Sequence, residues 1–203
     1  MQKSLLQAVI SDQKALKWEP SAIDREHVSI LEDDSVVVIS GIRRCGKSTL
    51  LQAIRAKNKE QDYYLNFDDD RLIKFKVEDF QLLLELFGER YGKQTTFYFD
   101  EIQNISGWER FVRRLHDYGN KVYITGSNAS MLSKELGTHL TGRYQQVELY
   151  PFSFREYLKL NQIDPNSLDH FSTDHKALLK GSFNDYFNLG GFPAFLKSKH
   201  PEY

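Results

Sequence analysis

The chain has 203 residues with an ordinary globular composition, 40% hydrophobic and 27% charged. Its formal net charge of −1 gives no overall positive field to attract nucleic acid, and its single cysteine excludes an internal disulfide and fits a reducing compartment. The longest purely aliphatic run, Val36 to Ile39, is far shorter than a membrane span. We therefore expect a cytoplasmic protein that engages neither nucleic acid nor a membrane.

The pattern of apolar residues predicts strands that alternate with helices along the first three quarters of the chain. Apolar residues at helical spacing predict an amphipathic helix over residues 4–18, ended by Pro20. Strands alternating with helices indicate an α/β fold with a mostly parallel sheet. The segments expected after the first helix are strands at 36–39, 63–67, 95–99, 122–125 and 146–149, and helices at 80–87 and 108–118.

The last quarter of the chain has a different character, because the strand signal stops after Pro151. We expect an N-terminal helix over 1–20, a core over 21–150, and helices over 151–203 that begin a lid or linker. Aromatic residues such as Phe154 and Tyr157 should pack under the sheet. The final residues do not resemble the end of a domain, so we expect a fragment of a longer protein.

The stretch VVVISGIRRCGKSTLLQAI contains the spacing G-x-x-x-x-G-K-[ST] between a predicted strand and a predicted helix. Glycines allow backbone N–H groups to face a phosphate chain, and the following helix adds its free N–H groups and the positive end of its dipole. Lys47 would reach the β- and γ-phosphates, and the Ser48 hydroxyl would ligate Mg²⁺. The alternative is a turn whose glycines serve only the backbone. The expected phosphate-binding residues are Gly41, Ile42, Arg43, Arg44, Cys45, Gly46, Lys47, Ser48 and Thr49.

The stretch TTFYFDEIQ predicts a strand that ends in two carboxylates. Ligands of open α/β sheets bind at the carboxyl ends of the strands, where Asp100 would hold the Mg²⁺ shell through water. Glu101 would polarise a water for attack on the γ-phosphate. The alternative is an acidic strand end that faces solvent.

The stretch VYITGSNASML predicts another strand, whose tip carries Ser127 and Asn128. Either side chain can contact the γ-phosphate or the attacking water as a sensor. A turn followed by a helix cap is an equally good interpretation.

Taken in order, SGIRRCGKST, FYFDEIQ, ITGSNASML, LTGRYQQVELYPFSFREYL and LGGFP resemble the AAA-type P-loop ATPases of bacteria and archaea that carry a further C-terminal domain. The resemblance covers about residues 20–195. It implies an additional-strand P-loop NTPase fold with strand order 5-1-4-3-2, and ATP with Mg²⁺ as cofactors. It implies that Asp100 and Glu101 form the Walker B pair, that Ser127 or Asn128 is the first sensor, and that Arg143 occupies the place of an arginine finger. It also implies that Pro193, in the Gly-x-Pro element, lies against the nucleotide.

The function expected from these motifs is hydrolysis of Mg²⁺–ATP to ADP and phosphate, coupled to an unknown client. The expected partners are ATP and ADP, together with further copies of the chain or a partner protein. The first alternative is a slow or non-hydrolysing switch in which ATP gates a partner interaction. The second is a P-loop phosphotransferase, against which Glu101 speaks because a kinase should exclude a hydrolytic water. For Arg143 the alternative is an ordinary surface ion pair.

Overall fold

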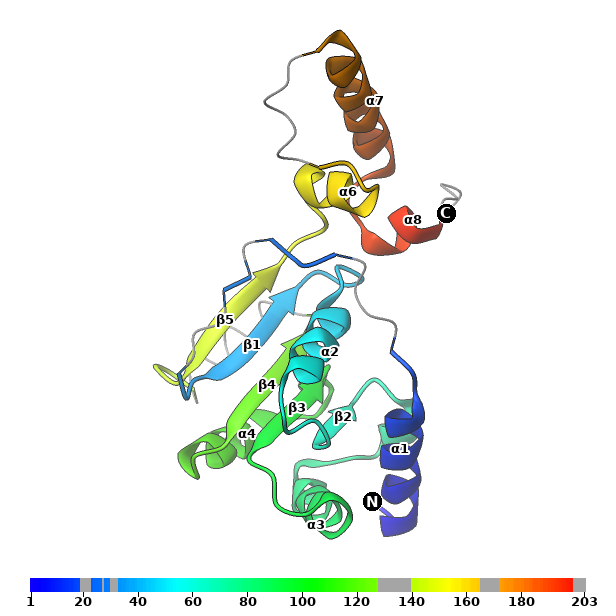
Figure 1. Cartoon of the computed structure of the whole chain (residues 1–203). Helices are drawn as coiled ribbons and strands as arrows, with labels where there is room; N and C mark the ends of the chain where they lie inside the picture. The colour runs from blue at the N-terminus through cyan, green and yellow to red at the C-terminus, as the bar shows by residue number, and fades with distance from the viewer. Residues whose placement is uncertain (19–22, 27, 30–32, 128–139, 165–171, 199–203) are drawn as a thin grey trace.

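The computed structural model describes residues 1–18, 23–26, 28–29, 33–127, 140–164 and 172–198. Its centre is a sheet of five parallel strands in the order β2-β3-β4-β1-β5 (Figure 1). Read from the other edge this is the predicted order 5-1-4-3-2, so the expected α/β fold class is confirmed. The strands are β1 (Val36–Gly41), β2 (Tyr64–Asn66), β3 (Thr96–Asp100), β4 (Lys121–Gly126) and β5 (Tyr144–Leu149).

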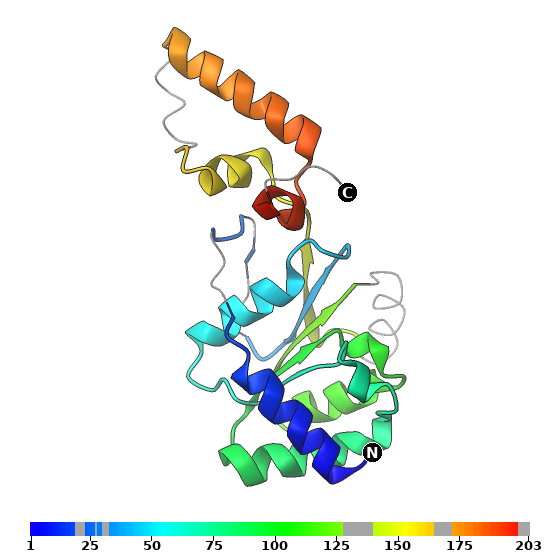
Figure 2. The same cartoon turned by 90° about the vertical axis from the view of Figure 1, so that its right-hand side faces the viewer.

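Alternate residues of a strand point to opposite faces of a sheet, and each face here has its own apolar core. Val36 and Val38 lie in a core that is covered by α1, α3 and α4, whereas Val37 and Ile39 lie in a second core covered by α2. Figure 2 shows the sheet from the side with the helices packed along it. These helices are α1 (Lys3–Ala15), α2 (Lys47–Lys57), α3 (Phe80–Tyr91) and α4 (Trp108–Asp117), with short 3-10 turns η1 (Asp70–Leu72), η2 (Val77–Asp79) and η3 (Ile102–Asn104).

The N-terminal helix is shorter than predicted. It ends at Ala15, and Leu16 and Trp18, which we expected on its apolar face, are 60% and 41% exposed. Leu6, Val9 and Ile10 are buried in the main core, so α1 is a part of that core. Pro20, the predicted stop, lies outside the described residues.

Three further helices lie beyond the carboxyl ends of the strands (Figure 1). They are α6 (Phe154–Leu160), α7 (Thr173–Leu189) and α8 (Pro193–Ser198). None of the helices within the described part of the chain is long and apolar enough to cross a membrane.

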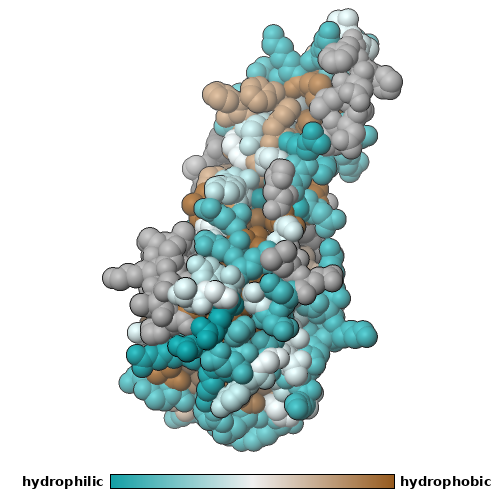
Figure 3. Space-filling view, turned by 90° about the vertical axis from the view of Figure 1, so that its left-hand side faces the viewer, coloured by the Kyte–Doolittle hydropathy of each residue, from teal (hydrophilic) through white to brown (hydrophobic). Residues whose placement is uncertain are grey.

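The aromatic side chains of α6 do not pack under the sheet, and that prediction is wrong. The Phe154 ring packs edge-on against Phe183, and the Tyr157 ring lies 5.5 Å from that of Tyr186, so α6 packs on α7. Because β5 ends at the carboxyl edge of the sheet, the chain after it has already left the sheet surface. Apolar side chains gather at this end of the molecule in Figure 3, and Phe187 is 78% exposed there.

Candidate functional site

The loop between β1 and α2 takes a shape that only glycine permits at two positions. Gly41 has a φ of 146°, and a Cβ on it would lie 2.2 Å from the Leu149 carbonyl oxygen of the neighbouring strand β5. Gly46 has a φ of 99° and is the residue directly before the first turn of α2. Both values lie in the region that L side chains rarely adopt. The two fixed glycines of the motif therefore serve the backbone, and the helix start behind them supplies free N–H groups.

Lys47 is the buried cation of this loop. Its residue is only 4% exposed, its Nζ donates a 3.1 Å hydrogen bond to the Ile42 carbonyl, and it lies 3.7 Å from Glu101 Oε1. A buried ammonium needs partners of this kind, because desolvation disfavours an isolated charge. The lysine thus crosses the mouth of the loop and faces the end of β3.

The other predicted loop residues divide into an exposed tip and a buried base. Ile42, Arg43 and Arg44 are exposed, and Arg44 holds the left-handed φ of 68°. Cys45 is buried, and burial raises the pKa of its thiol, so the side chain is a neutral filler of the loop. Thr49 lies in the first turn of α2.

Asp100, the last residue of β3, is fully buried and faces the loop. Its Oδ1 accepts hydrogen bonds from Ser48 Oγ at 3.1 Å and from Thr125 Oγ1 at 2.5 Å, and its Oδ2 lies 3.5 Å from the Tyr64 hydroxyl. Burial raises the pKa of Asp100, while the bonds from Thr125 and Ser48 act in the opposite direction. A hydroxyl and a carboxylate oxygen side by side are ligands of the type that Mg²⁺ takes, so this pair fits the expected metal.

Glu101 follows in a left-handed conformation, with a φ of 51°, which turns its side chain toward Lys47. Its Oε2 accepts hydrogen bonds from Ser127 Oγ and Gln103 Nε2, both at 2.5 Å. Its side chain is 17% exposed, so the two carboxylates do not form a solvent-facing strand end. The positive φ is a strained arrangement of the kind that gathers at functional sites.

Of the two predicted sensor residues, Ser127 lies beside Glu101 at the tip of β4. Asn128 lies outside the described residues. A third polar residue of this strand, Thr125, was missed by the sequence reasoning. Its hydroxyl accepts a 2.9 Å bond from the Glu101 N–H while donating to Asp100, so it links the backbone of Glu101 to the carboxylate of Asp100. The parallel register of β3 and β4, which pairs Phe99 with Ile124, places Thr125 beside these two residues. The register between two strands cannot be predicted from the residue pattern of a single sequence.

Two residues far away in sequence approach the loop at Gly46. A Cβ on Gly46 would lie 3.9 Å from Pro193 Cγ and 3.7 Å from Arg25 Nη1. Pro193, which the resemblance implies to lie against the nucleotide, is the first residue of α8 and lies near this loop. Its contact with a nucleotide stays a prediction. Arg25 was not predicted, because it lies outside every motif.

Arg143 lies away from this group. It precedes β5, and its carbonyl accepts a 2.8 Å hydrogen bond from the N–H of Val36, the first residue of β1. It therefore sits at the amino edge of the sheet, a whole strand length from the loop. Its Nε lies 3.4 Å from Asp117 Oδ1, and both side chains are about two-fifths exposed, at 39% and 45%.

Comparison with known proteins identifies the family to which a chain with this site is similar. A family model described as an AAA domain matches residues 33–158, which is more than half of the chain.

The relatives of the chain are longer than the chain itself. The uncharacterised protein MJ1544 of Methanocaldococcus jannaschii is 37% identical over 192 residues, which cover 94% of this chain and 43% of that protein. An uncharacterised protein of Haemophilus influenzae is 34% identical over 182 residues, which cover 86% and 43%. The chain thus spans less than half the length of both. Among solved structures, AMPPCP-bound DnaA from Aquifex aeolicus matches with a TM-score of 0.48 and 16% identity, covering 80% of this chain and 52% of that one.

Proposed function

The chain belongs to the AAA domain family, and from that premise we propose that it binds Mg²⁺–ATP at the loop between β1 and α2 and hydrolyses it to ADP and phosphate. One observation carries the proposal. The buried Lys47, the Ser48–Asp100 pair and Glu101 meet at the carboxyl edge of the sheet, with Lys47 3.7 Å from Glu101 and Ser48 3.1 Å from Asp100.

Each of these groups has a separate task in the proposed reaction. The amides of the loop and the Lys47 ammonium would bind and orient the phosphates, because they are fixed positive groups in a largely desolvated site. Ser48 and Asp100 would hold the metal, which would neutralise negative charge on the phosphates. Glu101 would take the proton from the attacking water. Its Oε2 is held by Ser127 and Gln103, which fixes the direction in which the carboxylate presents its other oxygen.

A slow, switch-like ATPase is the second candidate, and the contacts of Glu101 favour it. The carboxylate is engaged by Lys47, Ser127 and Gln103 at once. A base with three partners must give up part of that network before it accepts a proton, so the turnover of the isolated chain would be low. The same carboxylate beside Lys47 would activate water, which speaks against transfer of the phosphate to another acceptor.

Two further proposals concern the helices after β5 and the role of Arg143 in an assembly of several copies. We propose that residues 151–203 act as a lid or linker, since Pro193 lies close to the loop at Gly46. Arg143 is too far from the loop of its own chain to touch that nucleotide. We propose that it acts on the nucleotide of a neighbouring copy in a homo-oligomer. The cytoplasmic location stays a prediction from composition.

The test of the proposed function is Lys47→Ala with Lys57→Ala as its control. Lys57 lies at the far end of the same helix, with a side chain that is 78% exposed. We expect titration calorimetry to detect Mg²⁺–ATP binding, and a phosphate-release assay to detect turnover, in the parent and in Lys57→Ala. Both signals should be lost in Lys47→Ala at unchanged circular dichroism. Normal ATP affinity in Lys47→Ala would contradict the assignment of this loop to the phosphates.

A further inference from the structure

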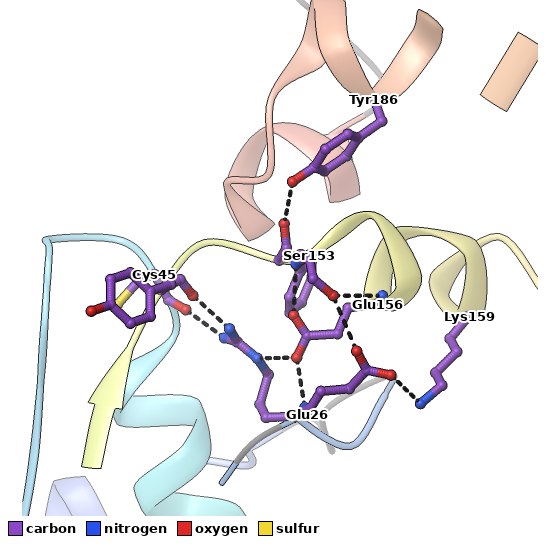
Figure 4. A network of polar contacts seen from close by, with 9 residues as sticks. Glu26, Cys45, Ser153, Glu156, Lys159 and Tyr186 are labelled. Carbon is purple, nitrogen blue, oxygen red and sulfur yellow. Dashed lines mark hydrogen bonds and ion pairs between the residues drawn. The ribbon is translucent and has the colours of Figure 1, made fainter. Parts of the chain in front are cut away.

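A single arginine, Arg25, joins the loop to the helices that follow β5. Its Nε donates to Glu156 Oε1 at 2.8 Å, its Nη1 to the Cys45 carbonyl at 2.9 Å, and its Nη2 to the Tyr150 carbonyl at 2.5 Å (Figure 4). The Arg25 side chain is 9% exposed and the Glu156 side chain 3%. One guanidinium therefore contacts the phosphate loop, the end of β5 and α6, and it lies outside every sequence motif.

The bond to the Cys45 carbonyl determines the direction of the next amide. In a planar trans peptide the C=O and the following N–H point in opposite directions. Arg25 holds the Cys45 carbonyl toward itself, so the Gly46 N–H must point away from Arg25. Gly46 belongs to the loop that would bind the phosphates, and its amide is one of the donors available to them.

The partner of Arg25 is fixed to the first turn of α6. Glu156 Oε1 also accepts the Glu26 N–H at 2.8 Å, and Oε2 accepts the Ser153 N–H at 2.8 Å in a capping box. Glu26 in turn accepts from Lys159 at 2.7 Å. Glu156 therefore cannot move without α6, and a displacement of α6 displaces the guanidinium that holds the loop carbonyl.

The link to α6 is continuous with α7 and α8. Phe152, whose ring lies 4.8 Å from the Arg25 guanidinium, donates its N–H to the Gly191 carbonyl at 2.6 Å and accepts from the Tyr186 hydroxyl at 2.8 Å. A Cβ on Gly191 would lie 2.3 Å from the Phe152 carbonyl oxygen, so glycine is needed for this approach.

We propose that Arg25 is a positioning residue, which aims the Gly46 amide at the bound phosphates and is itself held by Glu156. The affinity of the loop for phosphates then depends on the placement of α6. This inference rests on the proposed function, because it names what sets the affinity of that site.

The test compares five variants of the full chain, four single and one double. Arg25→Gln removes the cation, Arg25→Lys keeps the charge but cannot bridge three acceptors with one planar fork, and Glu156→Gln touches no atom of the loop. The control is Arg71→Gln, because Arg71 is another arginine that forms ion pairs, here with Asp69 and Asp12, but it lies at η1 and contacts α1. If Arg25→Gln does not fold, Arg25→Lys is measured in its place.

The first readout is affinity for Mg²⁺–ATP and for magnesium tripolyphosphate, which has no nucleoside. We expect roughly tenfold weaker binding of both probes in the Arg25 variants and in Glu156→Gln, on the scale of one hydrogen bond to a charged group. The double variant Arg25→Gln with Glu156→Gln should bind no more weakly than Arg25→Gln, because the two residues act through one contact. The control should bind as the parent does.

The second readout is hydrogen exchange of the loop amides without any ligand. Exchange over residues 42–47 should quicken in the Arg25 and Glu156 variants and stay at the parent rate in Arg71→Gln. Unchanged loop exchange, an equal loss of affinity in the control, or a loss for ATP without one for tripolyphosphate would each overturn the inference. A parent chain that binds neither probe would refute the proposed function, and the loop exchange would still decide whether Arg25 holds the Gly46 peptide.

Discussion

Thr125→Val removes the hydroxyl that joins the Asp100 carboxylate to the Glu101 backbone N–H. Valine keeps the shape of threonine, so it opens no cavity at this fully buried position. It removes the 2.5 Å donor to Asp100 and leaves the Glu101 N–H, now bonded at 2.9 Å, without an acceptor. A hydrogen bond to a charged group contributes about 1.5–3 kcal/mol, and an unpaired buried donor costs a similar amount. We expect the free energy of unfolding to fall by about 3–6 kcal/mol, the sum of the two losses.

The matched control is Thr125→Ser, which keeps the hydroxyl and removes only the methyl group. It should cost about 1 kcal/mol. The Mg²⁺ concentration that gives half-maximal ATP hydrolysis should rise by roughly 10–100-fold in the valine variant, the usual effect of losing a residue that orients a metal ligand. Urea unfolding and a magnesium titration of phosphate release measure the two effects. Equal losses in the valine and serine variants would refute the reasoning, since the hydroxyl would then contribute nothing.

Three other outcomes follow from contacts described above. Glu101→Gln should bind ATP as the parent does and hydrolyse it more slowly by roughly 10²–10⁴-fold, because an amide cannot take the proton; an unchanged single-turnover rate would contradict this role. Arg143→Ala should lower turnover without changing ATP affinity, and mixing it with Glu101→Gln should restore some activity; parent turnover that is independent of protein concentration, with no rescue, would leave Arg143 as the surface partner of Asp117. Hydrogen bonds from Arg71 lower the pKa of Asp69 to about 2, below its unfolded value, so this carboxylate stabilises the fold above about pH 4 and stops doing so as pH falls toward 2. The difference in unfolding free energy between the parent and Asp69→Asn should therefore shrink over that range in urea titrations, and a constant difference would exclude the linkage.

Most strands of the sheet, and the position of the loop between β1 and α2, could be predicted from the sequence. A strand buried along its whole length and a glycine spacing required by a turn are local patterns, so β1 and the loop from Gly41 to Ser48 could be predicted directly as backbone structure. The end of α1 could not, because apolar residues at helical spacing continue to Trp18, whereas the last buried residue of the helix is Gln13 and the helix ends at Ala15.

The residues that were missed share a physical reason. Thr125 reaches Asp100 through the register of two strands, and Arg25 reaches Glu156 across most of the chain. Such contacts depend on how distant segments dock, and periodicity reports only on neighbours a few residues apart. The same reason explains why the aromatic side chains of α6 were assigned to the wrong surface.

The strand order also sets a problem for the newly made chain. β1 is the most apolar of the five described strands and is made before the other four. Its two neighbours are the last of these five to be made, with Val37 pairing with Tyr123 of β4 and Val36 with Tyr144 of β5. Until both arrive, a flat aliphatic segment with two free edges is exposed to other chains. Pairings between strands this distant in sequence form slowly, because the long intervening segment must lose conformational entropy before any stabilising contact can form. We therefore expect synthesis and refolding of this chain to depend on dilution or on a chaperone that shields β1, far more than its final stability would suggest.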